Sequence, residues 1–130
     1  MDILKIFKSD RDGIRESHVK NLLSVALADG HMNSDEWELL CAIARVIGFS
    51  EEKITSIQKN PDQVRFVPPK KYEDKVEQIQ DLVAIMTIDG QINTKELELC
   101  KKISLKLDLL PQLVDDIIQQ IVSPKPTAAP

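Results

Sequence analysis

The sequence predicts an all-α protein of six to seven helices, one domain built from two pseudo-twofold-related three-helix repeats. The first observation is an internal repeat, in which residues 22–38 align without a gap on residues 82–98. The second is that apolar residues recur at helical spacing in both copies. The third is a scarcity of aromatic residues, 4%, so that the core must be built from Leu, Ile and Val. Such a repeat indicates one helical unit used twice and packed against itself.

The domain boundaries follow from the repeat. A chain of 130 residues is long enough for one core, and we expect residues 1–122 to form a single domain. The first repeat is expected at 14–60, the second at 72–122, and a connector at 61–71 between them. Residues 123–130 show no periodicity and are expected to form a flexible tail.

The first helix of each repeat is predicted to carry one apolar stripe and to end at an Asp-Gly dipeptide. Glycine adopts the left-handed conformation that closes a helix. These helices are expected at 15–29 and 75–89. Their stripe residues are Val19, Leu22, Leu23, Ala26 and Leu27 in one copy, and Ile79, Leu82, Val83 and Met86 in the other. Before them, the first eight residues are predicted to form a short helix that packs Ile3, Leu4, Ile6 and Phe7 onto the bundle.

The second helix of each repeat begins after an asparagine. Asn33 and Asn93 are suitable N-caps, and Glu36 and Glu96, three residues later, are expected to complete capping boxes. These helices are expected at 34–47 and 94–107. The residues expected to face the core here are Met32, Leu40, Ile43, Ala44, Ile47, Ile92, Cys100, Ile103 and Leu107.

The third helix of the first repeat is expected to follow a Ser50 cap and to bury Ile54 and Ile57. Its counterpart starts near Pro111, a residue that the first turn tolerates. The apolar residues of that counterpart are Leu113, Val114, Ile117, Ile118 and Ile121. The prolines of the connector predict an irregular segment, because proline lacks an amide donor and restricts the residue before it.

Composition excludes several classes of function. The net charge of −4, with no basic face and few aromatics, argues against a nucleic-acid partner. No run approaches the roughly 20 apolar residues of a membrane span, so membrane insertion is not expected. Asp2 and the interrupting lysines argue against a signal peptide. Cys41 and Cys100 are expected to be buried reduced thiols, and the protein to be cytoplasmic.

The Asp-Gly loops resemble the second half of a calcium-binding EF-hand loop, which needs oxygen ligands at positions 1, 3, 5, 7, 9 and 12. With Gly30 at position 6, positions 1 and 3 are Val25 and Leu27, and the second copy has Ile85 and Thr87 there. Neither loop is therefore expected to be an EF-hand. Helix capping explains the same residues and is preferred.

A shared metal site is the alternative. It would use Asp29, Glu36, Asp89 and Glu96 to hold a divalent ion, if the repeat packing brings the two loops together. Convergence of these carboxylates within about 6 Å would favour a site over simple caps.

The duplicated helix–Asp-Gly-x-[apolar]-x-x-x-Glu–helix unit resembles the TerB-like family, named for a bacterial tellurite-resistance protein. The resemblance covers about residues 14–122 and implies a compact helical domain with an acidic cluster. It also implies a link to stress response, membrane-linked complexes or metal sensing, without a family-wide enzyme activity. The four carboxylates match the acidic motif positions of the family. This chain departs from acid-rich members at His31, Gln91, Asn33 and Asn93, which weakens the attraction for a divalent ion.

No catalytic or cofactor-binding residue is assigned. The chain has no Gly-rich phosphate loop, His-Glu-x-x-His motif or nucleophile elbow, so an enzyme is not expected. His18 and His31 are expected to be exposed and solvated. The basic residues around the connector are interpreted as a solvated loop, with a docking patch for an acidic partner as the alternative. These residues are Arg65, Lys70, Lys71 and Lys75.

The resulting expectation is a cytoplasmic, non-enzymatic, TerB-like interaction or scaffolding module, with a metal-responsive module as the alternative. The interaction surface is expected near the two Asp-Gly junctions, because exposed positions differ there between the repeats while the caps do not. We expect a basic or polar protein partner, with a homodimer as a further possibility. The surface residues are Asp29, His31, Asp35, Gln91 and Lys95.

Overall fold

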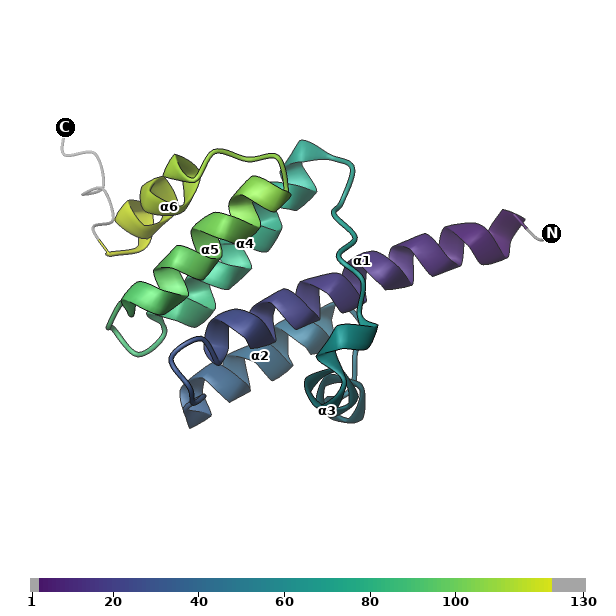
Figure 1. The fold of residues 1–130 in the computed structure, drawn as a ribbon, viewed down its shortest axis with the longest axis horizontal. Coiled ribbons are helices and arrows are strands. Elements are labelled where there is room, and N and C mark those ends of the chain that lie inside the picture. The colour runs from purple at the N-terminus through teal and green to yellow at the C-terminus, as the bar shows by residue number, and fades with distance from the viewer. Residues whose placement is uncertain (1–2, 123–130) are drawn as a thin grey trace, which may run out of the picture.

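The regular secondary structure of the described residues consists of helices, without strands, as predicted (Figure 1). The computed structural model describes the backbone of residues 3–122 and the side chains of residues 11–122. The predicted tail at 123–130 lies outside the described residues. The elements are α1 (Ile3–Ala26), α2 (Ser34–Val46), α3 (Glu51–Lys59), the 3₁₀ turn η1 (Pro61–Gln63), α4 (Tyr72–Thr87), α5 (Thr94–Lys106) and α6 (Gln112–Val122).

The helices pack in the pattern expected of a pseudo-twofold. The first helices of the two repeats, α1 and α4, pack against each other at the centre (Figure 1). Around this pair every contact has a counterpart: α1 with α2 and α3 is matched by α4 with α5 and α6. The contact between α1 and α5 is matched by that between α4 and α2. Each repeat therefore covers the apolar face of the other.

The two Asp-Gly junctions form the same kind of turn. Gly30 has a φ of 103° and Gly90 a φ of 80°, the left-handed region that side chains with a Cβ avoid. In both turns the aspartate Oδ1 accepts a bond from the amide two residues on: Asp29 from His31 at 3.2 Å, and Asp89 from Gln91 at 3.0 Å. The equivalence of the two repeats thus extends to the hydrogen bonds of the loops.

Most residues of the predicted stripes lie in the core, whereas Leu27 is only half-buried. Residues Val19, Leu22, Ile79 and Leu82 are fully buried, as the spacing predicted. Ile92, assigned to the core, is 43% exposed, so that prediction was wrong; Ile121, an apolar residue of the last helix, is 47% exposed. Ile92 lies in the loop before α5, and Ile121 in the last turn of α6. At neither position does a described helix pass over the side chain.

The first helix is longer than expected. α1 runs without interruption from Ile3 to Ala26, so the predicted separate short helix at the N-terminus was wrong. Its backbone hydrogen bonding simply continues through Gly13. In Figure 1 the first turns of α1 extend beyond the other helices. The expected packing of Ile3, Leu4, Ile6 and Phe7 concerns side chains that lie outside the described residues.

The connector is irregular after η1, as predicted, and is fastened along α1. The amide of Val67 donates to Ser17 Oγ at 2.9 Å. Lys20 Nζ donates to the Val64 carbonyl at 3.2 Å, and Val64 is buried. None of the helices within residues 3–122 combines the length and the apolar character that crossing a membrane requires.

Candidate functional site

The first loop places its polar groups by a complete capping box. Asn33 Oδ1 accepts from the Glu36 amide at 2.8 Å, and the Asn33 amide donates to Glu36 Oε1 at 3.3 Å. Both bonds satisfy donors that the start of α2 would otherwise leave unpaired. The predicted capping role of Asn33 and Glu36 is confirmed.

The second loop caps differently. Asn93 Oδ1 accepts from the amides of Lys95 at 2.8 Å and Glu96 at 3.3 Å. Among the described residues no donor lies within hydrogen-bond distance of the Glu96 carboxylate, so the predicted second capping box was wrong at Glu96. The backbone explains the difference, because ψ is 134° at Asn93 and 172° at Asn33, which turns the cap amide relative to its helix. The Glu96 side chain is thereby released from capping.

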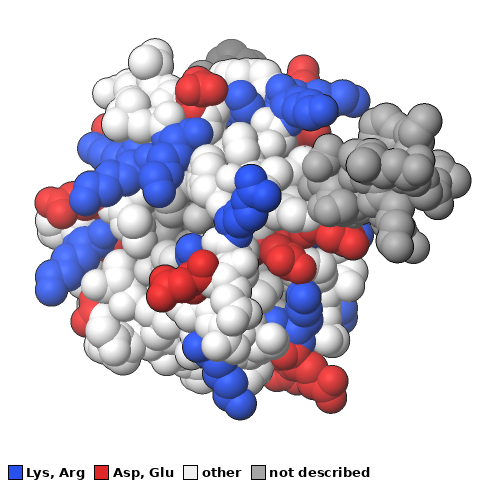
Figure 2. All heavy atoms as spheres, turned by 45° about the vertical axis from the view of Figure 1, so that its right-hand side comes forward, with Lys and Arg blue, Asp and Glu red and all other residues white. Residues whose placement is uncertain are grey.

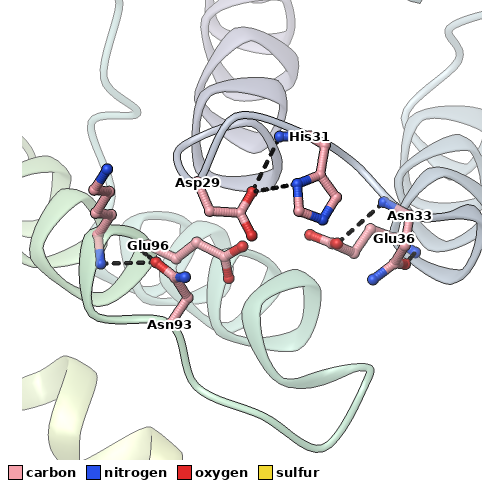
Figure 3. A network of polar contacts seen from close by, with 7 residues as sticks. Asp29, His31, Asn33, Glu36, Asn93 and Glu96 are labelled. Carbon is pink, nitrogen blue, oxygen red and sulfur yellow. Dashed lines mark hydrogen bonds and ion pairs between the residues drawn. The ribbon is translucent and has the colours of Figure 1, made fainter.

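Acidic side chains from the two loops face one another. Figure 3 shows Asp29, Glu36 and Glu96, from opposite repeats, turned towards the space between the loops. Glu36 and Glu96 are each only 4% exposed. The pKa of Glu96 is raised to about 7, mainly by burial and further by the charges of Glu36, Asp29 and Asp89. The loops are therefore close enough for carboxylates of the first repeat to raise the pKa of Glu96 in the second. The sequence left open whether the two loops meet.

Glu36 shows the same effect in a weaker form. Burial is the main cause that raises its pKa, and the charges of Asp89 and Asp29 add to it. The hydrogen bond from the Asn33 amide and the nearby His31 act in the opposite direction. The Glu36 carboxylate is thus half satisfied: Oε1 has a donor, while Oε2 is buried without a partner.

Little positive charge balances this acidic cluster, defined as Asp29, Glu36, Asp89 and Glu96. Among the described residues no lysine or arginine forms an ion pair with any of the four. A basic side chain beside the cluster is that of His31, whose Nδ1 lies 3.9 Å from Asp29 Oδ1. Its side chain is 80% exposed, so the predicted exposure of His31 is confirmed. The cluster is therefore strongly acidic, and its Glu36 Oε2 is a hydrogen-bond acceptor without a donor.

The donor geometry does not fit a metal ion as it stands. Within the described side chains, no three His, Cys, Asp or Glu residues are arranged to hold a metal ion. Calcium requires about six to eight oxygen ligands at 2.3–2.6 Å. Four carboxylates, one of them from the exposed Asp89, do not supply that shell.

The other histidine corrects a prediction. His18 was expected to be exposed, but it is 4% exposed, and its Nε2 lies 2.8 Å from Asp81 Oδ2 on α4. Its Nδ1 is buried without a partner. The wrong prediction has a physical reason, since α4 covers a face of α1 that reads as polar. The sequence did contain a signal for its burial, because His18 lies one helical turn before Leu22 on the apolar stripe.

The cysteines behave as predicted. Both are free and buried, with Cys41 7% and Cys100 0% exposed. The pKa of Cys100 is raised to about 12, mainly by burial and also by the charge of Glu96. A thiol with such a pKa is a poor nucleophile at neutral pH. These residues are therefore part of the core.

Comparison with family models, with curated proteins and with solved structures finds no match for this chain.

Proposed function

We propose that the protein is a non-enzymatic, TerB-like interaction module that receives a cationic group of a protein partner at the acidic cluster. The observation that carries this proposal is that Asp29, Glu36 and Glu96, from both repeats, face the space between the loops, with Glu36 Oε2 buried and unpartnered. A lysine ammonium or an arginine guanidinium supplies only donors, and so complements this set of acceptors.

Several features of the surface support a protein partner. His31 and Gln91 are exposed beside the cluster, and they differ between otherwise equivalent loops. The face shown in Figure 2 carries basic side chains in separate groups with acidic ones between them, unlike a continuous nucleic-acid surface. The overall net charge is −4. A basic segment of another protein is the partner that this distribution favours.

The test is site-specific photo-crosslinking. A photoreactive residue at position 31 or 91 is compared in native host cells with one at Lys59, at the far end of the first repeat on α3. We expect crosslinks from the loop positions only, to partner peptides rich in Lys and Arg. The same experiment with Asp29→Asn/Asp89→Asn should lose these crosslinks, whereas the matched surface variant Asp62→Asn/Glu98→Asn should keep them. Equal crosslinking by the two double variants would place the partner contact elsewhere.

A metal-responsive module is the second candidate. The elevated pKa of Glu96 favours it, because a cation that binds the cluster would displace a proton and relieve the mutual repulsion. The absence of three suitably arranged donors among the described residues opposes it. A link to tellurite resistance or another stress response belongs to the TerB-like resemblance and stays a proposal. Sensitivity of a deletion strain to tellurite, with rescue by wild type, would check that link.

A further inference from the structure

A second feature, separate from the acidic cluster, is a cavity of about 530 Å³ between α1, α4 and the end of the connector. Its size falls in the range of small-molecule sites, about 300–1,000 Å³. It lies beside the N-terminal halves of α1 and α4, whereas the acidic cluster lies beyond their C-termini. From His18 to Ala26, the last residue of α1, the separation along the helix is about 12 Å, at 1.5 Å per residue.

The cavity has an ordered base. His18 and Asp81 join its two helical walls through the 2.8 Å contact, and the buried Gln78 lies beside them. Apolar surface comes from Ile14 and from Ile47 at the end of α2. This combination, an apolar lining with a few fixed polar groups, is typical of a ligand site.

Charges of both signs line the walls. Arg11 and Arg15 lie one turn apart on α1, and Lys70 and Lys71 face the cavity from the connector. Asp74 and Glu77 line it from α4. With any described residue, Arg15 forms only a loose 3.9 Å pair with Asp12, and the other five form no ion pair. The cavity thus gathers groups of both signs, none of which has a close ion-pair partner among the described side chains.

We propose that this cavity binds a zwitterionic small molecule. Its anionic group, a carboxylate or a phosphate, would contact the cations Arg11, Arg15, Lys70 and Lys71, and its amino group would contact Asp74 and Glu77. A purely anionic ligand would pair with the cations but would be repelled by the two carboxylates. A purely cationic ligand would pair with the carboxylates but would be repelled by the four cations. A ligand with both charges satisfies both sets, which is the physical basis of this choice.

The test uses matched sets of probes and the full chain. Phenylalanine is compared with 3-phenylpropionate and 2-phenylethylamine, which each keep one charge. Phosphorylethanolamine is compared with ethyl phosphate and ethylamine, so that the two sets distinguish a carboxylate from a phosphate source. Amide and imidazole NMR shifts are followed up to about 10 mM probe, where a Kd near 1 mM is measurable. We expect at least one zwitterion to bind about tenfold more tightly than either of its single-charge analogues, with shifts at His18 and Gln78.

Paired variants locate the site. Lys70→Gln/Lys71→Gln and Asp74→Asn/Glu77→Gln should each weaken the zwitterion about tenfold, whereas the exposed controls Lys59→Gln/Lys102→Gln and Asp62→Asn/Glu98→Gln should not. Circular dichroism and thermal unfolding establish that every variant folds. The proposal is overturned if no zwitterion binds, if a single-charge analogue binds as tightly, or if cavity and control variants behave alike.

Discussion

Glu96 is the residue whose environment departs most from its sequence pattern. Glu36 and Glu96 occupy equivalent positions and are equally buried, yet only Glu36 returns a bond to its cap. Glu96 has instead a pKa raised to about 7 by burial and by three neighbouring carboxylates. Ionising it in the folded state therefore works against stability at neutral pH.

Glu96→Gln should stabilise the protein in a pH-dependent way. The folded state retains the Glu96 proton between about pH 4.5 and 7, while the unfolded chain has released it. The contribution of this proton is thus complete below the unfolded pKa and is lost as pH rises through the folded pKa. We expect variant and wild type to be similarly stable near pH 4.5, and the variant to be more stable by about 1–3 kcal/mol at pH 8.

Urea unfolding at both pH values measures this difference. Glu98→Gln on the exposed face of α5 is the control, and it should give no such pH dependence. A variant that is less stable than wild type at pH 8 would contradict the assignment of Glu96 as a strained carboxylate.

At the scale of elements, glycine has opposite roles in the helix and in the turns. Gly13 lies inside α1, and a Cβ there would meet Val67 at an ordinary 3.5 Å. Gly90 has a φ of 80° with open space around it, so a Cβ there would meet no neighbour and would be disfavoured only by the positive φ. The two positions therefore separate helix propensity from turn strain.

Gly13→Ala should stabilise the protein by about 0.5–1 kcal/mol, because alanine loses less backbone entropy in a helix. Gly90→Ala should destabilise it by about 1 kcal/mol or more, since alanine disfavours a positive φ. Thermal unfolding of both variants measures the two signs. Equal signs would show that α1 is not continuous through Gly13 or that the turn relaxes without penalty.

The loops also predict weak calcium binding. Val25, Leu27 and Ile85 occupy positions that an EF-hand fills with oxygen ligands, and all three are apolar. Val25 and Ile85 are moreover fully buried in the core. Calorimetric titration with calcium should give no dissociation constant in the sensor range of about 10⁻⁷ to 10⁻⁵ M. A constant in that range would make the metal-responsive alternative the better function.

For the whole molecule, the central feature is that the two repeats share one core. α1 packs against α4 and α5 as well as against its own partners, and α2 packs against α4. Leu22 and Leu82, one from each repeat, are both fully buried. Neither repeat closes its apolar face alone.

A fragment of residues 1–60 should therefore fail to fold by itself. Removing the second repeat exposes the apolar stripe of α1, and isolated helices of this length are marginal in water. Circular dichroism and NMR of the fragment should show little helix and poor dispersion, while the full chain should unfold in one cooperative transition. Mixing the fragment with residues 61–130 should restore structure. A stable, well-dispersed fragment would contradict the shared core.

The sequence alone determined the features that depend on short-range physics. Helix periodicity, the Asn33, Asn93 and Ser50 caps, and the two glycine turns involve residues within a few positions of each other. The repeat added the expectation that the two copies of one helical unit pack against each other, and the structure shows that α1 and α4 make this contact.

Only the tertiary structure decided the features that depend on which helix covers which surface. His18 reads as polar along α1 but is buried because α4 brings Asp81 to it. The sequence pattern assigns Glu96 to a cap, but the fold brings it near Glu36 and Asp29 of the other repeat. The mixed-charge cavity joins α1 to residues more than fifty positions away. Such long-range contacts set burial and electrostatic environment, and a local pattern does not contain them.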